Sequence, residues 1–201
     1  MSFESSSLRL IDTMRHDKVL INFDESVIHQ SDMRTYSWQR KSQPARRVFG
    51  KDISGLSILL AVTSDGFSVH QFLDGNNNEV SVSSFIVGLV RELDRARPGW
   101  RKKSVLLLDN CASHKTAMTR RLLTKLKVPT LFSAPASYTV CPVERFFGAI
   151  KRLDFDRRDL LAEPFADKRQ LKRLTNKQQM MSKVSNYLLN LSPTKAKHLF
   201  K

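Results

Sequence analysis

The sequence predicts an α/β fold in which a mixed five-stranded sheet carries helices on its faces. Three observations lead to this class. Five short apolar stretches have the composition of strands, the first three precede any strong helical pattern, and the last two alternate with helices. Consecutive strands favour antiparallel pairing, whereas strands that alternate with helices favour parallel pairing. We therefore expect both kinds of pairing in one sheet.

The first three strands are expected at residues 18–23, 54–63 and 67–73. The first reads KVLINF, and we expect Asp24 to close it. The second and third flank a Ser-Asp-Gly turn at 64–66, which predicts a hairpin. The sheet thus begins with antiparallel strands.

Helical periodicity begins after this hairpin. Residues 82–96 place apolar side chains at the spacing of an amphipathic helix, and the Pro-Gly pair at 98–99 ends it. Residues 104–108 are almost wholly apolar, which is typical of a central parallel strand buried on both faces.

Two more strand–helix units are expected downstream. Residues 113–127 predict a helix with Ser113 as its N-cap, and residues 128–132 predict the fifth strand. Another helix can start at Pro142 and run through Ile150, because proline is tolerated in the first turn.

The remaining residues have apolar side chains at helical spacing, which predicts one or two amphipathic helices that cover the core or form a dimer face. We divide the chain into a lead segment at 1–17, an α/β domain at 18–152 and a basic helical tail at 153–201.

The charge of the chain indicates its class of partner. Its 201 residues include 34 Lys and Arg against 19 Asp and Glu, a formal net charge of +15, which favours a polyanion such as nucleic acid. The excess is concentrated at 145–201, with smaller basic groups at 34–51 and 97–103, although each group taken singly could be solvated surface. The predicted DNA contacts are Arg40, Lys41, Arg46, Arg47, Lys115, Arg145, Lys151 and Arg152.

Other classes of protein are disfavoured. No apolar run approaches the ~18 residues that span a bilayer, and the N-terminus lacks the apolar core of a secretory signal. Cys111 and Cys141 cannot form a disulfide framework, and no Cys/His spacing suggests structural zinc. We expect an intracellular protein without a membrane partner, in the nucleus of a eukaryote or the cytoplasm or nucleoid of a bacterium.

Three acidic residues occupy positions where a carboxylate is unusual unless it has a structural or functional role. Asp24 and Asp109 each follow an apolar strand, and Glu144 lies in the first turn of a helix. Functional groups gather at the carboxyl ends of strands in open α/β sheets, and an unpaired carboxylate is costly to bury. Each acid could instead cap a turn or favour a helix N-terminus. Clustered carboxylates suit Mg²⁺ or Mn²⁺, and two such ions can catalyse phosphoryl transfer on DNA.

Four segments around these acids follow one another in order. They are INFDES at 21–26, YSWQRKSQP at 36–44, LLLDNCASHK at 106–115 and SAPASYTVCPVERFFGAIKR at 133–152. Together they resemble the blocks of mariner-type transposases, in which three blocks carry the catalytic acids and one is a basic segment with a tryptophan. The resemblance spans residues 18–152, about two thirds of the chain.

The resemblance implies an RNase H-like fold and a DDE triad, made of Asp24, Asp109 and Glu144, as metal ligands. The 34 residues between Asp109 and Glu144 are a spacing common in this superfamily and in its bacterial insertion-sequence relatives. The implied activity is metal-dependent DNA cleavage and strand transfer on transposon ends and a target duplex, with two ions of Mg²⁺ or Mn²⁺ and no small-molecule cofactor. A homodimer is one assembly it allows.

Three alternatives stay open at this point. The chain could be a domesticated or remnant DNA-binding domain without cleavage activity, another RNase H-like nuclease, or a basic scaffold component of a nucleoprotein assembly. It also departs from the family pattern. Only 23 residues precede Asp24, which leads us to expect no helix-turn-helix region for reading transposon ends, and Phe147 stands where tryptophan is common.

Three neighbours of the triad are further candidates. Asn110 and His114 could support the site by touching a phosphate or a bound water, or could serve only in capping and packing. Glu25 could replace Asp24 as a ligand, but alternation along a strand sends these two side chains to opposite faces, and the resemblance selects Asp24.

Overall fold

The structure is a computed structural model that describes residues 18–29, 55–73, 75, 77–133, 141–153 and 166–200, with only the backbone for 166–173, 175 and 176. Four of the predicted DNA contacts lie outside the described residues: Arg40, Lys41, Arg46 and Arg47.

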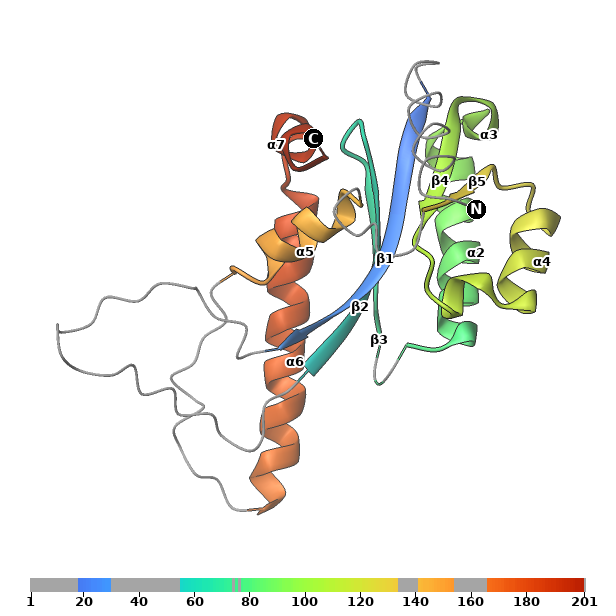
Figure 1. The fold of residues 1–201 in the computed structure, drawn as a ribbon. Helices are drawn as coiled ribbons and strands as arrows, with labels where there is room; N and C mark the ends of the chain where they lie inside the picture. Colours follow the sequence, from blue (N-terminus) through green and yellow to red (C-terminus); the bar gives the residue numbers. More distant parts are fainter. Residues whose placement is uncertain are drawn as a thin grey trace, which may run out of the picture.

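A five-stranded mixed sheet forms the centre of the protein, in the order β3-β2-β1-β4-β5 (Figure 1). The strands are β1 (Val19–His29), β2 (Gly55–Thr63), β3 (Ser68–Leu73), β4 (Ser104–Leu108) and β5 (Thr130–Phe132). β1, β2 and β3 pair antiparallel, whereas β4 pairs parallel with both β1 and β5. The predicted mixed architecture is therefore confirmed.

Strand β1 is longer than predicted, and Asp24 lies within it instead of closing it. The parallel pairing with β4 stops at Phe23, which pairs with Leu108, but the antiparallel pairing with β2 continues as far as His29. Pairing with β2 thus extends β1 beyond the point where its pairing with β4 ends.

Helices cover both faces of the sheet (Figure 1). One face carries α2 (Glu79–Ala96) and α4 (Ala117–Lys125), and the short α3 (Trp100–Lys103) leads into β4. The other face carries the remaining three helices, α5 (Val143–Ile150), α6 (Ala166–Leu189) and α7 (Pro193–Phe200). The predicted helical tail is thus present, and no helix in the described part of the chain is long and apolar enough to cross a membrane.

Alternation along β1 separates its side chains between the two cores. Phe23 packs in the core beneath α2, where its ring stacks on Phe85 with centroids 4.9 Å apart, whereas Ile28 packs in the core beneath α5 and α6. Even-numbered positions of β1 thus face α5, which places Asp24 on that side and Glu25 on the α2 side.

The segment after β4 differs from the single helix that was predicted. Ser113 starts a 3₁₀ turn, η1 (Ser113–Lys115), and does not cap the helix. The N-cap of α4 is Thr116, whose extended backbone (ψ 156°) interrupts the helical path and whose side chain accepts a hydrogen bond from the Thr119 N–H. This turn directs His114 into the protein interior, where its side chain is fully buried.

Candidate active site

Parallel pairing of β1 with β4 brings Asp24 and Asp109 to the same level of the sheet. Each aspartate follows the last residue of that pairing, which joins Phe23 to Leu108. Asp24 is half-buried, and its Oδ1 accepts a hydrogen bond of 2.8 Å from the Glu25 N–H. Burial and then the negative charge of Asp109 raise the pKa of the Asp24 carboxyl from 3.8 to about 7. A cation would relieve this cost.

A buried histidine joins Asp109 to Glu25. His114 Nδ1 lies 2.5 Å from Asp109 Oδ1, and its Nε2 lies 2.7 Å from Glu25 Oε2. Burial opposes the charged ring, but hydrogen bonds to Asp109 and Glu25 outweigh burial and raise the pKa of His114 to about 10. His114 is therefore an imidazolium at neutral pH and donates from both ring nitrogens.

The same contacts hold Asp109 ionised. Burial favours its neutral form, but hydrogen bonds from His114 and from the Cys111 N–H, 2.9 Å away, bring the pKa of Asp109 below its ordinary value. The positive charge of Lys115 acts in the same direction. At neutral pH Asp109 is thus a fixed carboxylate.

Glu144 is exposed in the first turn of α5, and it is the third acid of the predicted triad. The turn is held by Asn22, whose Oδ1 accepts a 2.8 Å hydrogen bond from the Val143 N–H and whose Nδ2 donates to the Leu107 carbonyl over 3.2 Å. Asn22 precedes Asp24 by two residues on the same face of β1, and Val143 immediately precedes Glu144. One hydrogen bond therefore links the segments that carry these two acids.

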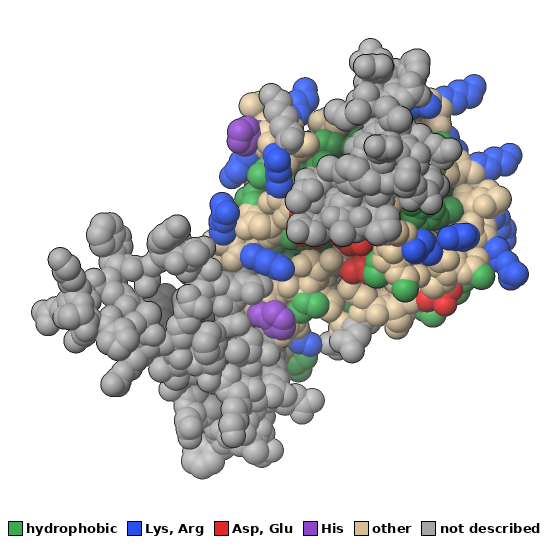
Figure 2. Space-filling model, viewed as in Figure 1, with side chains coloured by type: hydrophobic (Ala, Val, Ile, Leu, Met, Phe, Trp, Pro, Cys, Tyr) green, Lys and Arg blue, Asp and Glu red, His purple; other side chains and the backbone are tan. Residues whose placement is uncertain are grey.

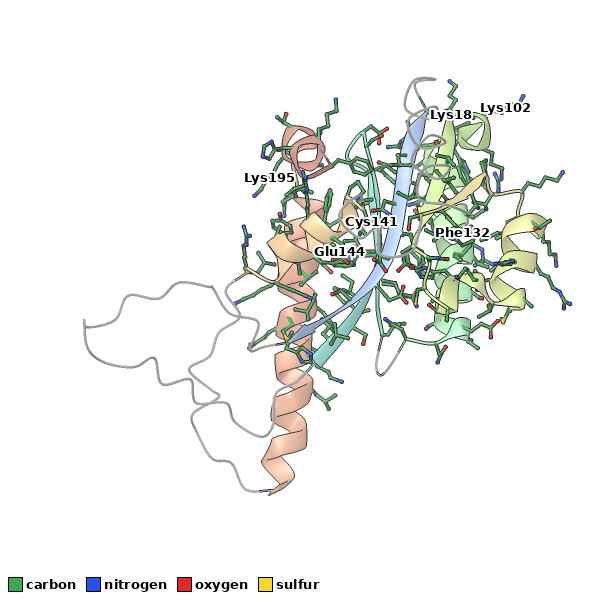
Figure 3. The ribbon with its side chains drawn as sticks, viewed as in Figure 1. Lys18, Lys102, Phe132, Cys141, Glu144 and Lys195 are labelled. Atoms are coloured by element: carbon green, nitrogen blue, oxygen red, sulfur yellow. The ribbon has the colours of Figure 1, made fainter. Side chains whose placement is uncertain are left out.

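Cys141 is buried just before α5, and its thiol is affected by all three acids. Burial and then the negative charges of Asp24, Asp109 and Glu144 raise the pKa of this thiol to about 11. Figure 3 shows Cys141 and Glu144 at the start of α5, beside β1.

Among the described residues, one group of acids and histidine lies close enough to share a metal ion, and it has Asp24 in common with the predicted triad. One oxygen of Asp24, one oxygen of Glu25 and one ring nitrogen of His114 lie within 4.8 Å of one another. A protonated imidazole has no free lone pair, so His114 cannot ligate a metal while it bridges its two carboxylates. Glu25 already accepts hydrogen bonds from His114 and from Ser113 Oγ, 3.2 Å away. Asp24 is therefore the member of this group that also belongs to the predicted triad.

The other predicted residues lie around this centre. Asn110 is half-buried beside Asp109, Arg145 and Arg152 are exposed on α5 and just after it, and Lys151 is half-buried. Figure 2 shows acidic side chains near the middle of the visible face, with Lys and Arg side chains around them. His114 is fully buried, and both of its ring nitrogens contact carboxylates, those of Asp109 and Glu25.

Sequence reasoning missed two elements of the site. Asn22 was not recognised, although a lone amide inside the apolar strand KVLINF is a signal, because an amide in a core must find hydrogen-bond partners. Glu25 was considered only as a rival ligand, and its pairing with His114 spans 89 positions in the sequence.

Comparison with known families identifies this arrangement. Residues 19–172 match the family described as DDE superfamily endonuclease, which is more than half of the chain. The chain belongs to this family. A comparison with curated protein sequences gave no significant match.

Solved structures of the Mos1 mariner transposase have the same fold as this DDE superfamily member. The Mos1 strand transfer complex aligns with a TM-score of 0.70 at 18% identity, over 98% of this chain and 55% of that chain. The Mos1 paired-end complex with Mn gives 0.62 at 18% identity, over 91% and 60%. The isolated Mos1 catalytic domain gives 0.54 at 16% identity, over 98% and 89%.

These matches show that the chain shares the fold of the Mos1 catalytic domain, which is the RNase H-like fold that the sequence predicted. The chain spans only 55–60% of the length of the transposase chains in the complexes.

Proposed function

We propose that this DDE endonuclease domain is the catalytic domain of a transposase, which cleaves DNA strands and joins them to a target. The observation that carries the proposal is the position of Asp24 and Asp109, each directly after the last residue pair of the β1–β4 pairing, in a chain of the DDE endonuclease family. Glu144, in the first turn of α5, is proposed as the third acid. Three carboxylates in a strongly basic chain are suited to hold cations against DNA phosphates.

The donor set fits Mg²⁺ or Mn²⁺. It consists of hard carboxylate oxygens. Burial and then the charge of Asp109 raise the pKa of Asp24, and a bound cation would offset both effects. Solved Mos1 structures include complexes with Mg and with Mn. We propose two ions, which when bound would activate the attacking oxygen and stabilise the leaving oxygen of a phosphodiester.

The three acids and His114 have different proposed roles at the metal site. Asp24 and Asp109 supply ligands from neighbouring strands, and Glu144 supplies a third from the start of α5. His114 fixes Asp109 Oδ1, which leaves the second oxygen of that carboxylate free for a metal.

Basic side chains on this side of the molecule would hold the DNA. Lys115 follows the second acid, and Arg145, Lys151 and Arg152 lie on or just after α5, so all four are proposed to bind phosphates without reading sequence. Mos1 structures are described as paired-end complexes, and we propose a homodimer that acts on transposon ends and a target duplex.

The test is nicking of supercoiled plasmid and joining of a 3′-hydroxyl oligonucleotide, each with Mg²⁺, Mn²⁺ or EDTA. The wild type is compared with Asp109→Ala and Glu144→Gln, and with Glu92→Gln, a surface glutamate of α2 paired with Arg95, as the control. We expect metal-dependent products from the wild type and Glu92→Gln, and at least a 100-fold loss in the other two, since a ligand is removed.

Equal activity in the wild type and Asp109→Ala would contradict the proposed site. DNA binding without metal-dependent cleavage would instead favour a domesticated DNA-binding domain. Activity restricted to RNA–DNA hybrids or branched DNA would favour another nuclease of this fold.

A further inference from the structure

We propose that Asn22 is a positioning residue that holds Glu144 in place relative to Asp24 and Asp109. The inference rests on the proposed metal-dependent function and adds to it a residue that touches neither metal nor DNA. Asn22 has no exposed surface, and both ends of its amide are engaged across different elements.

The environment of Asn22 would otherwise exclude an amide. It sits in β1 between the apolar residues Ile21 and Phe23, both buried in the core. Burying an amide costs free energy unless its donors and acceptor are bonded. Asn22 meets that condition by accepting from the Val143 N–H and donating to the Leu107 carbonyl.

This bond adds a polar link to the start of α5, which core packing of Val143 and Phe146 also holds. The first N–H groups of any helix lack partners within the helix, and the N-cap of α5 is Pro142, which provides no side-chain cap. Asn22 satisfies the Val143 N–H from a strand 121 positions earlier in the sequence. The helix start is therefore fixed to β1.

The three elements joined by Asn22 are those that supply the triad. Asp24 lies two residues further along β1, Asp109 lies two residues after Leu107, and Glu144 directly follows Val143. Asp24 and Asp109 remain aligned by the β1–β4 pairing even without Asn22, whereas Glu144 has no strand pairing of its own. Loss of the amide should therefore displace Glu144 alone.

A double-mutant cycle on Mn²⁺ binding tests this inference. Free Mn²⁺ is measured by electron paramagnetic resonance, without DNA, in the wild type, Asn22→Ala, Glu144→Ala and the double variant. We expect Asn22→Ala to weaken Mn²⁺ binding by about 10-fold or more when Glu144 is present, in the range for residues that orient ligands. In the Glu144→Ala background the same change should alter binding by less than about 2-fold, because coupled residues are not additive.

Two results would overturn the inference. An equal loss on replacing Asn22 in both backgrounds would show that the residue acts through general stability and not through Glu144. Mn²⁺ binding that does not depend on Asp109, tested with Asp109→Ala, would remove the proposed metal site itself and the inference with it. The two failures are thus distinguishable.

The control variant is Ser57→Ala. Ser57 is also buried in the sheet, and its side chain donates a 2.7 Å hydrogen bond to the Gly75 carbonyl. Its backbone pairs with β1 at Val27, three residues beyond Asp24, but its side-chain bond does not join the segments that carry the triad. It should lower the melting temperature and leave Mn²⁺ binding unchanged, and a loss of binding like that of Asn22→Ala would overturn the inference. If Asn22→Ala does not fold by circular dichroism, Asn22→Ser, which is too short to span Leu107 and Val143, takes its place in the cycle.

Discussion

Asp24 shows at the scale of one residue how a functional site opposes stability. Its carboxyl is half-buried and repelled by Asp109, so the pKa of Asp24 is about 7 in the folded chain against 3.8 ordinarily. A carboxyl with a raised folded-state pKa stabilises the fold while protonated, and that contribution is lost as the pH rises from 3.8 to about 7. The metal-free protein should therefore be less stable above pH 7.

Asp24→Asn is expected to stabilise the metal-free protein at pH 8. The amide retains an acceptor for the Glu25 N–H and removes the charge, so the gain can reach about 4 kcal/mol, the equivalent of the pKa change. Thermal unfolding at pH 8 and pH 4 measures this, and the gain should nearly vanish at pH 4. Mn²⁺ should stabilise the wild type and not the variant. A lower stability of Asp24→Asn at pH 8 would contradict the prediction.

His114 illustrates the opposite case, a buried charge that its partners stabilise. Replacing it with alanine leaves Asp109 and Glu25 without their shared donor, which should cost about 3–5 kcal/mol, as expected when a buried ion pair loses one member. Because the pKa of His114 is about 10, its contribution is fully present below pH 6.5 and is lost as the pH rises through 10.

Urea unfolding of His114→Ala and the wild type at pH 6 and pH 10.5 checks this. The difference in unfolding free energy should shrink at the higher pH. The exposed His198 provides the control variant His198→Ala, which should match the wild type at both. A constant difference for His114→Ala across this range would indicate that the ring acts only by packing.

At the scale of elements, the packing of α7 on the β2–β3 turn closes the face that carries α5. Gly66 in this turn has φ +98°, and a Cβ there would lie 3.3 Å from both Ala196 Cβ and Pro193 Cα. Gly66→Ala should therefore destabilise the protein by about 1–3 kcal/mol, from backbone strain and overpacking.

Gly88→Ala is the matched control, with the opposite sign expected. Gly88 lies inside α2, and nothing is within 4 Å of its added Cβ, so alanine should stabilise by about 0.5–1 kcal/mol through helix propensity. Melting curves of both variants measure these two changes in stability. A neutral Gly66→Ala would mean that α7 does not pack tightly on the turn.

The elements also show which features could be predicted from sequence. Apolar runs and helical periodicity are local features, so they are enough to predict the succession of strands and helices along the chain. The mixed pairing follows from that succession. The extension of β1 beyond Asp24 depends on its pairing with β2, and the displaced cap of α4 depends on the backbone of Thr116. Asn22 and His114 have partners 121 and 89 positions away, which a local pattern does not contain.

At the scale of the whole molecule, the aspartates of the triad and a pair of lysines lie at opposite ends of strand β4. Asp24 and Asp109 lie just beyond the carboxyl ends of the parallel pairing between β1 and β4, and Arg145 and Arg152 are exposed on α5 and just after it. Lys102 and Lys103 immediately precede β4, at the other end of the same strand and about 16 Å away along its five residues. DNA held for cleavage should contact the first pair and not the second.

This arrangement predicts how the affinity for DNA responds to salt. The measurement is fluorescence anisotropy of a labelled duplex between 50 and 300 mM KCl, for the wild type and two double variants. Each phosphate contact adds about 0.9 to the slope of log affinity against log salt concentration, so Arg145→Ala with Arg152→Ala should lower its magnitude by about 2. Lys102→Ala with Lys103→Ala makes the same change in net charge and should leave the slope within about 0.5 of the wild type. If both pairs lower the slope equally, total charge and not the edge beside the triad determines where DNA binds.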